Sequence, residues 1–235
     1  MAIIRLIHTL LFYLTFAVTF LIGTAITVMI APFAKDQTRL FQTSAHYWTK
    51  VLVFASGIKI QKTGLKNIPQ DKAVIFASNH QGAVDVMLLL AVLPIGFRFA
   101  IKKELFKIPL FGWYIKKAGY FSIDRKMIRS AYRTVEEIIA IVQSGGSVLI
   151  FPEGTRTKTG ELGTFKRGSL LAALKSKAAI MPVAISGSFH ILPKGSLILH
   201  PRPVKFSVGQ PIEITSETDY TTKVEEVRNS IAKML

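Results

Sequence analysis

The sequence predicts an α/β domain, a single domain with a central mixed β-sheet flanked by helices, behind an N-terminal helical segment. After residue 62, short β-rich runs alternate with helical runs, which is the pattern of an α/β fold. The first 33 residues are instead almost uncharged and apolar. A length of 235 residues suits one globular domain with an attached segment. We therefore expect two parts, residues 1–62 and 63–235.

The N-terminal segment is predicted to be embedded in a membrane. Across residues 6–33 the only side chain that can carry charge near neutral pH is His8, and the run 10–33 is long enough to cross a hydrocarbon core. A signal peptide with Arg5 as its basic region fits less well, because the apolar stretch is too long and no clear cleavage site follows. A buried core helix also fits less well, because a helix that is apolar all round is unusual as the first element of a domain this small. Hydropathy leaves open whether the segment spans the bilayer or turns back at Gly23.

The next stretch, 35–62, mixes basic with apolar and aromatic residues. An interfacial helix would place the basic groups against lipid phosphates and the pair Tyr47 and Trp48 at headgroup depth. An ordinary amphipathic helix packed on the domain explains the same pattern. After Lys35, the basic side chains of this stretch are Arg39, His46, Lys50, Lys59 and Lys62.

Composition indicates anionic partners in a lipid environment. Thirty Lys and Arg against fourteen Asp and Glu give a formal charge of +16, which suits nucleic acid or anionic lipid. A mean hydropathy of +0.39 favours the lipid, because nucleic-acid binders of this basicity are usually polar. The absence of cysteine excludes disulfides, thiolate zinc sites and a cysteine nucleophile.

Seven strands and four helices are predicted in the α/β part. The helix 128–143 is the best defined, because apolar residues recur at helical spacing and Gly145 and Gly146 follow it. The run 180–185 is purely apolar and is interpreted as a buried strand that carries no chemistry. The expected strands are 73–77, 97–101, 120–123, 148–151, 180–185, 197–200 and 204–208, and the expected helices are 84–92, 128–143, 168–175 and 222–234.

The first candidate site is the run 79–85, which follows a strand and opens a helix. Strand ends of α/β sheets commonly display catalytic side chains. His80 has an ordinary pKa near neutrality, so its neutral imidazole can accept a hydroxyl proton. Asp85 can hold the other ring nitrogen and stabilise the imidazolium. The alternative is a structural histidine, with Asp85 placed in the first helical turn for its dipole.

The second candidate site, 151–168, also follows a strand and is rich in glycine. Glycines allow backbone N–H groups to approach a phosphate, which Arg156 can bind bidentately while Lys166 adds charge. The run is not a Walker loop, because Ser169 follows Gly168 where lysine is required. A glycine-rich surface loop with solvated basic residues is the alternative.

Cations follow two further predicted strands. Lys102 and Lys103 come after 97–101, and Arg125 comes after 120–123, so they can converge on one anionic ligand, although each alone is more often a solvated surface group. The motifs G-x-S-x-G, H-E-x-x-H and G-x-G-x-x-G are missing, which argues against serine hydrolases, zinc proteases and dinucleotide enzymes. His190 and His200 receive no role.

Four blocks in order, NHQGAVD, GYFSIDR, FPEGTR and IMPVAI, resemble the glycerolipid acyltransferase family, most closely its bacterial 1-acyl-sn-glycerol-3-phosphate acyltransferases. The resemblance covers roughly 67–211. It implies a general base at His80 oriented by Asp85. One departure is Thr157, where the family commonly has serine. The resemblance also implies acceptor-phosphate binding by Lys102, Lys103, Arg125, Glu153, Gly154, Thr155 and Arg156.

The implied reaction moves a fatty acyl group from acyl-CoA or acyl carrier protein to the free hydroxyl of 1-acyl-sn-glycerol 3-phosphate (lysophosphatidate), giving phosphatidic acid. Neither metal nor cofactor is expected. The expected location is the inner membrane, with the catalytic domain on the cytoplasmic face. The expected partners include membrane phospholipids and exclude nucleic acid. The alternatives are transfer to glycerol 3-phosphate or another lyso-lipid, and a non-catalytic module that binds membrane lipid.

Overall fold

A seven-stranded mixed sheet forms the centre of the molecule. The computed structural model describes residues 2–123, 128–193 and 195–235. The strand order is β1-β7-β6-β2-β5-β3-β4, and every neighbouring pair is parallel except β6 and β7. The predicted fold class, a mixed sheet flanked by helices, is confirmed. The strands are β1 (Ile60–Thr63), β2 (Ile75–Ser78), β3 (Phe97–Lys102), β4 (Phe121–Ile123), β5 (Ser147–Ile150), β6 (Ile180–Ser186) and β7 (Val204–Val208).

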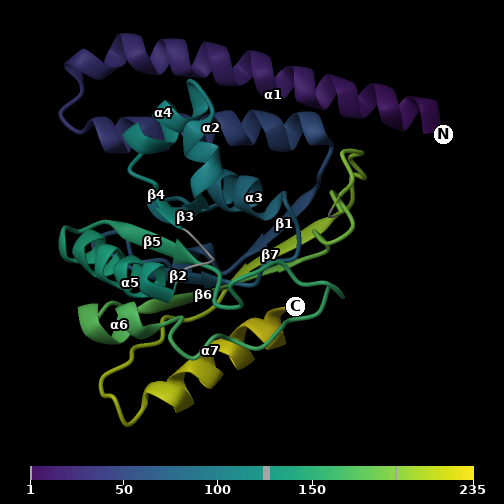
Figure 1. Cartoon of the computed structure of the whole chain (residues 1–235). Coiled ribbons are helices and arrows are strands. Elements are labelled where there is room, and N and C mark those ends of the chain that lie inside the picture. Colours follow the sequence, from purple (N-terminus) through teal and green to yellow (C-terminus); the bar gives the residue numbers. More distant parts are fainter. Residues whose placement is uncertain (1, 124–127, 194) are drawn as a thin grey trace.

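Helices cover both faces of this sheet (Figure 1). α2, α3 and α4 lie on one face with α1 outside them, and α5, α6 and α7 lie on the other. The sheet has a hydrophobic core on each face. Successive side chains of β2 point to opposite faces, so Phe76 joins the core under α2 and α3, and Ile75 joins the core under α5, α6 and α7. The helices are α1 (Ala2–Ile30), α2 (Gln37–Ser56), α3 (Asp85–Val92), α4 (Phe111–Lys117), α5 (Ile128–Gln143), α6 (Leu171–Ser176) and α7 (Tyr220–Met234), with short 3-10 turns η1 (Ala31–Phe33), η2 (Leu65–Asn67) and η3 (Lys103–Lys107).

α1 is docked along α2 and continues unbroken through Gly23. Three side-chain hydrogen bonds fix it at successive points: His8 Nε2 with the carbonyl of Ala55 (3.2 Å), Trp48 Nε1 to Thr19 (3.0 Å), and Thr27 to Ser44 (2.7 Å). The face turned away from α2 remains apolar and exposed along the whole helix. By length and composition, 3–33 is the only stretch of the described chain able to cross a membrane.

α2 packs on the domain, as the second interpretation of 35–62 required. Phe41, Ala45 and Leu52 are buried at helical spacing. The expected pair at headgroup depth is split: Tyr47 is exposed, whereas Trp48 packs between Phe16 and Phe20 of α1. The aromatic rings of this stretch therefore serve partly to hold α1.

Three element predictions were wrong or missing. β1 was missed because Lys59 and Lys62 suggested an amphipathic helix, whereas lysines are typical of an edge strand, which β1 is. The segment 197–200 is not a strand. The N–H of Leu199 donates to the hydroxyl of Thr9 in α1 (3.1 Å), so this backbone group bonds to the helix and not to a neighbouring strand. α4 was also missed, being only seven residues long.

Candidate active site

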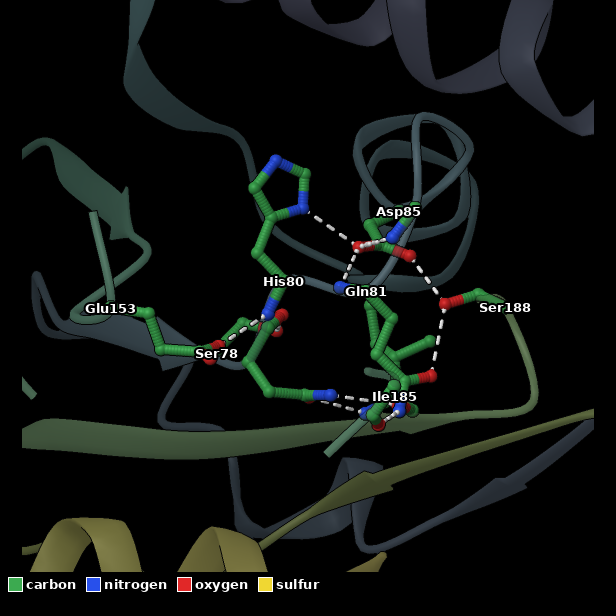
Figure 2. Close-up of polar contacts among 10 residues, drawn as sticks. Ser78, His80, Gln81, Asp85, Glu153, Ile185 and Ser188 are labelled. Atoms are coloured by element: carbon green, nitrogen blue, oxygen red, sulfur yellow. Dashed lines mark hydrogen bonds and ion pairs between the residues drawn. The ribbon is translucent and has the colours of Figure 1, made fainter. Parts of the chain in front are cut away.

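His80 and Asp85 are in direct contact at the carboxyl end of β2. His80 follows this central strand by two residues, and Asp85 begins α3. His80 Nδ1 lies 2.7 Å from Asp85 Oδ2 (Figure 2). Since a carboxylate only accepts hydrogen bonds, Nδ1 carries the proton of the neutral ring, and Nε2 keeps a lone pair. The contact predicted between these two side chains is therefore present.

Asp85 is fully buried and surrounded by donors. Its Oδ2 also accepts the backbone N–H groups of Gln81 (2.7 Å) and Gly82 (2.8 Å), while Oδ1 accepts the hydroxyl of Ser188 (2.6 Å). With four donors on two oxygens, the cluster suits a carboxylate, which a buried position tolerates only when it is well hydrogen-bonded. The two backbone bonds to Asp85 also fold the chain tightly between the strand and α3.

The imidazole of His80 is held from one side and open on the other. Its ring stacks on Phe151 at 4.0 Å between centroids and 16° between planes. The side chain remains 12% exposed. Figure 2 shows Nε2 pointing away from Asp85 and Ser188, and within the described chain it has no hydrogen-bond partner. Nε2 is thus the ring atom available to a substrate.

The loop after β5 is tied to the backbone of His80. Glu153 Oε1 accepts the His80 N–H (2.9 Å), and Thr157 N–H donates to the His80 carbonyl (2.9 Å). The other carboxylate oxygen of Glu153 accepts the N–H of Gly163 (2.8 Å), where a Cβ would lie 2.8 Å from that oxygen and would force the carboxylate to shift. Both oxygens of Glu153 are therefore engaged by backbone groups.

Arg156 lies between these two ties. It is exposed, as is Thr155, while Gly154 adopts a positive φ of 74° with the Lys166 side chain against it. Because Glu153 and Thr157 both bond the His80 backbone, the three residues between them are confined next to it. The second candidate site is thus physically joined to the first.

The remaining cations end the next strand of the sheet. β2, β5 and β3 are parallel neighbours, so Lys102, the last residue of β3, lies on the same edge as His80, and Lys103 follows it. Both lysines are exposed; Lys102 is 3.7 Å from Glu104, also exposed, so this pair contributes little stability. Arg125 lies outside the described residues, just beyond β4.

Ser188 was missed as a member of the site, and Gln81, which lies in the first candidate run 79–85, was given no role. Ser188 follows β6, the neighbour of β2 on its other side, so the strand-end argument used for His80 applies to it equally. It was overlooked because the apolar run before it suggested a purely structural strand. Gln81 joins the loop by donating to the carbonyl of Gly160 (2.8 Å) and accepts from Ser188 (3.3 Å).

Comparison with known proteins identifies this arrangement. The family described as Acyltransferase matches residues 59–186, more than half of the chain, including β2, β5 and β6 with all the contacts above except those of Ser188. The chain belongs to this family.

Two relatives of this acyltransferase-family chain carry the name 1-acyl-sn-glycerol-3-phosphate acyltransferase. The chain is 31% identical over 220 residues to the chloroplastic 1-acyl-sn-glycerol-3-phosphate acyltransferase of Arabidopsis thaliana, and the match covers 93% of this chain but 60% of that protein. It is 30% identical to the protein of the same name from Borreliella burgdorferi, covering 79% and 75%. The chain thus spans about three fifths of the length of the chloroplastic relatives from Arabidopsis thaliana and Brassica napus.

A solved structure matches nearly the whole chain. The crystal structure of the 1-acyl-sn-glycerophosphate (LPA) acyltransferase PlsC from Thermotoga maritima superposes with a TM-score of 0.83 at 27% identity. The match covers 99% of this chain and 95% of that one. The N-terminal helices are therefore part of the shared architecture as well as the sheet.

Proposed function

We propose that the chain transfers a fatty acyl group from a thioester to the free hydroxyl of 1-acyl-sn-glycerol 3-phosphate, giving phosphatidic acid. The observation that carries the proposal is the buried Asp85 holding His80 Nδ1 at 2.7 Å, with Nε2 left open. An imidazole in this state is a general base for an alcohol. The names of the relatives favour the particular alcohol.

In the proposed reaction, His80 Nε2 accepts the hydroxyl proton as the lipid oxygen attacks the thioester carbonyl carbon. Asp85 stabilises the imidazolium that forms. The tetrahedral intermediate then expels the thiolate with the C–S electron pair, and His80 returns its proton to the thiolate sulfur. The products are an ester and a free thiol, so the enzyme needs no covalent intermediate and, in this proposal, no metal or cofactor.

The acceptor phosphate is assigned to the cations at the same edge of the sheet. Arg156 offers a planar fork suited to phosphate, and Lys102 and Lys103 add point charges from the neighbouring strand end. Arg125, beyond β4, is proposed to join them. Glu153 contributes by holding the His80 backbone and the loop that carries Arg156.

The proposed seat of the enzyme is one leaflet of the inner membrane, with the domain on the cytoplasmic side. α1 is fixed to the domain from His8 to Thr27, which at 1.5 Å per residue is about 28 Å of helix. A helix docked over that length cannot also stand upright through the bilayer away from the domain. Its exposed apolar face instead fits a helix lying in the membrane plane.

A direct assay tests the proposal. Purified protein in detergent is given acyl-CoA or acyl carrier protein loaded with the same acyl chain, and lysophosphatidate, glycerol 3-phosphate or lysophosphatidylcholine as acceptor. We expect acylation of lysophosphatidate to be at least about tenfold faster than that of the others, because only it combines an acyl chain with an unsubstituted phosphate monoester. A preference for glycerol 3-phosphate would reassign the acceptor. Binding of lysophosphatidate without turnover from either donor would support the non-catalytic lipid-binding module.

A further inference from the structure

The segment from Lys103 to Lys117, formed by η3, a turn and α4, exposes an unusual concentration of apolar side chains. Beyond residue 57, the described chain has six exposed large hydrophobic residues, and four of them fall within nine positions of this segment. Their exposed fractions range from 38% to 47%, enough for a sizeable contact. A patch of this kind on a domain surface marks an interaction site. The four residues are Leu105, Ile108, Leu110 and Trp113.

Lysines surround this patch. Lys103 precedes Leu105, Lys107 follows it, and Lys116 and Lys117 end α4. All four lysines are exposed, and Glu104 is the only acidic residue of the segment. Apolar and tryptophan side chains bordered by lysine are the composition of elements that insert into a lipid interface. The charge is complementary to anionic headgroups.

The turn that carries the exposed Leu110 has an unusual, strained backbone. Leu110 has φ 59° and ψ −52°, and the N–H of Phe111 donates to the carbonyl of Pro109 at 2.6 Å, which together make a rare three-residue turn strained for a leucine. Gly112 closes the turn, since a Cβ there would lie 2.2 Å from the carbonyl oxygen of Phe106. The exposed side chain of Leu110 is more stable in an apolar medium than in water.

The segment is packed into the same layer as α1. Phe20 of α1 contacts the rings of Phe111 (5.7 Å) and Tyr114 (5.4 Å), and the Tyr114 hydroxyl donates to the carbonyl of Phe41 in α2 (2.8 Å). Burial raises the pKa of Tyr114 to about 12, so this donor stays protonated. Figure 1 shows α4 beneath α1 on the same side of the sheet.

We propose that residues 103–117 form a second membrane-inserting element, whose partner is the surface of an anionic phospholipid bilayer. The proposal rests on the membrane seat of the proposed function and adds a second point of attachment to it. The segment begins directly after Lys102, at the edge of the sheet that carries His80. Insertion here brings the cations assigned to the acceptor phosphate to headgroup depth, where a lysophospholipid already presents its phosphate.

The two tryptophans allow a direct test. Trp48→Phe leaves Trp113 as the only tryptophan of the full chain. The variant is mixed with vesicles of equal phosphatidylcholine and phosphatidylglycerol that carry bromine on the upper acyl chain. We expect a blue shift and at least about twofold quenching of Trp113 fluorescence. The matched control, Trp48→Phe with Trp113→Phe and Tyr132→Trp, places the reporter on α5 across the sheet and should show neither.

A paired variant separates this inference from the proposed function. Ile108→Ser with Leu110→Ser should weaken vesicle binding about tenfold and slow transfer to vesicle-borne lysophosphatidate, while transfer to a short-chain acceptor in detergent is unchanged. Trp113 quenching equal to the Tyr132→Trp control, or a response only to added acyl carrier protein, would overturn the inference. With transfer in detergent intact, that result leaves the proposed function standing. Quenching of Trp113 without acyl transfer from any donor would refute the proposed function and leave the membrane-inserting element supported.

Discussion

Asp85 is the most constrained side chain of the candidate site. It accepts four hydrogen bonds while fully excluded from solvent, and two of them come from the backbone immediately before α3. Its orientation is therefore fixed independently of His80. This explains how one carboxylate can serve both interpretations of the motif, as an orienting partner of the histidine and as a residue that shapes the start of the helix.

Ser188 is predicted to be a positioning residue for this carboxylate. Ser188→Ala leaves Asp85 Oδ1 without its donor, which should cost about 1–3 kcal/mol of stability. We expect kcat to fall about tenfold with little change in either KM, because the loss affects the imidazolium more than bound substrate. Steady-state kinetics with both substrates measures this. Ser186→Ala, at the end of β6, is the matched control, and an unchanged kcat in Ser188→Ala would refute the role.

Arg156 is predicted to act on the acceptor alone. Loss of a charge-assisted hydrogen bond costs about 1.5–3 kcal/mol, so Arg156→Ala should raise the KM for lysophosphatidate about tenfold or more. The KM for the thioester should change much less. Arg156→Lys keeps the charge but loses the planar guanidinium, so its KM for lysophosphatidate should lie between those of the parent chain and Arg156→Ala. The control is Lys158→Ala in the same exposed loop. Equal effects on both substrates would argue against a phosphate site at this position.

At the scale of elements, the docking of α1 is the feature with the largest consequence. The Phe20 side chain is 8% exposed and contacts the rings of Phe16, Trp48, Phe111 and Tyr114. α1 is therefore joined to α2 and α4 by one aromatic cluster. If this cluster persists in the membrane, α1 is an integral layer of the domain and not a detachable anchor.

Phe20→Ala tests this docking. Removing a buried phenylalanine should lower the free energy of unfolding by about 3–5 kcal/mol. The measurement is denaturant unfolding in detergent micelles, followed by the fluorescence of Trp48, in the same cluster, with Trp113→Phe present in every variant. Leu21→Ala, at a neighbouring exposed position of α1, should change it by less than about 0.5 kcal/mol. Similar effects of the two substitutions would mean that α1 separates from the domain.

The sequence predicted elements well where one physical signal dominated. The periodicity and terminal glycines of 128–143 predicted α5 at its observed bounds, and the continuous apolar run predicted β6 to within a residue. β1 escaped because an exposed edge strand that contains Lys62 and follows Lys59 has no buried alternation to reveal it. The segment 197–200 is apolar like a strand, but Leu199 is buried against α1, a long-range contact that local pattern cannot contain.

The site was predictable in its chemistry but incomplete in its supports. The histidine and carboxylate spacing pointed to a contact that the fold provides. The double tie of Glu153 and Thr157 to His80 joins residues about seventy positions apart, and Ser188 reaches Asp85 from more than a hundred. Such contacts depend on strand order, which the sequence alone does not specify.

At the scale of the whole molecule, the sheet separates two tasks. Its carboxyl edge gathers the ends of β2, β5, β3 and β6, which carry the histidine, the Arg156 loop, the lysines and Ser188. One of its faces carries the layers that end in α1 (Figure 1), whose outer side is apolar and exposed. An excess of sixteen positive charges favours anionic lipid surfaces over the chain as a whole. Substitutions at the carboxyl edge are thus expected to impair catalysis without membrane binding, and substitutions on the exposed side of α1 to impair membrane binding without catalysis.

The most direct measurement is the rate of acyl transfer by His80→Ala in single-turnover conditions, with phosphatidic acid quantified as product. Without its general base the enzyme should lose at least about a thousandfold in rate, while its thermal unfolding and vesicle binding stay close to those of the parent chain. His200→Gln, outside the site, should retain full activity. Transfer by a folded, membrane-bound His80→Ala protein at the parent rate would contradict the assignment of His80.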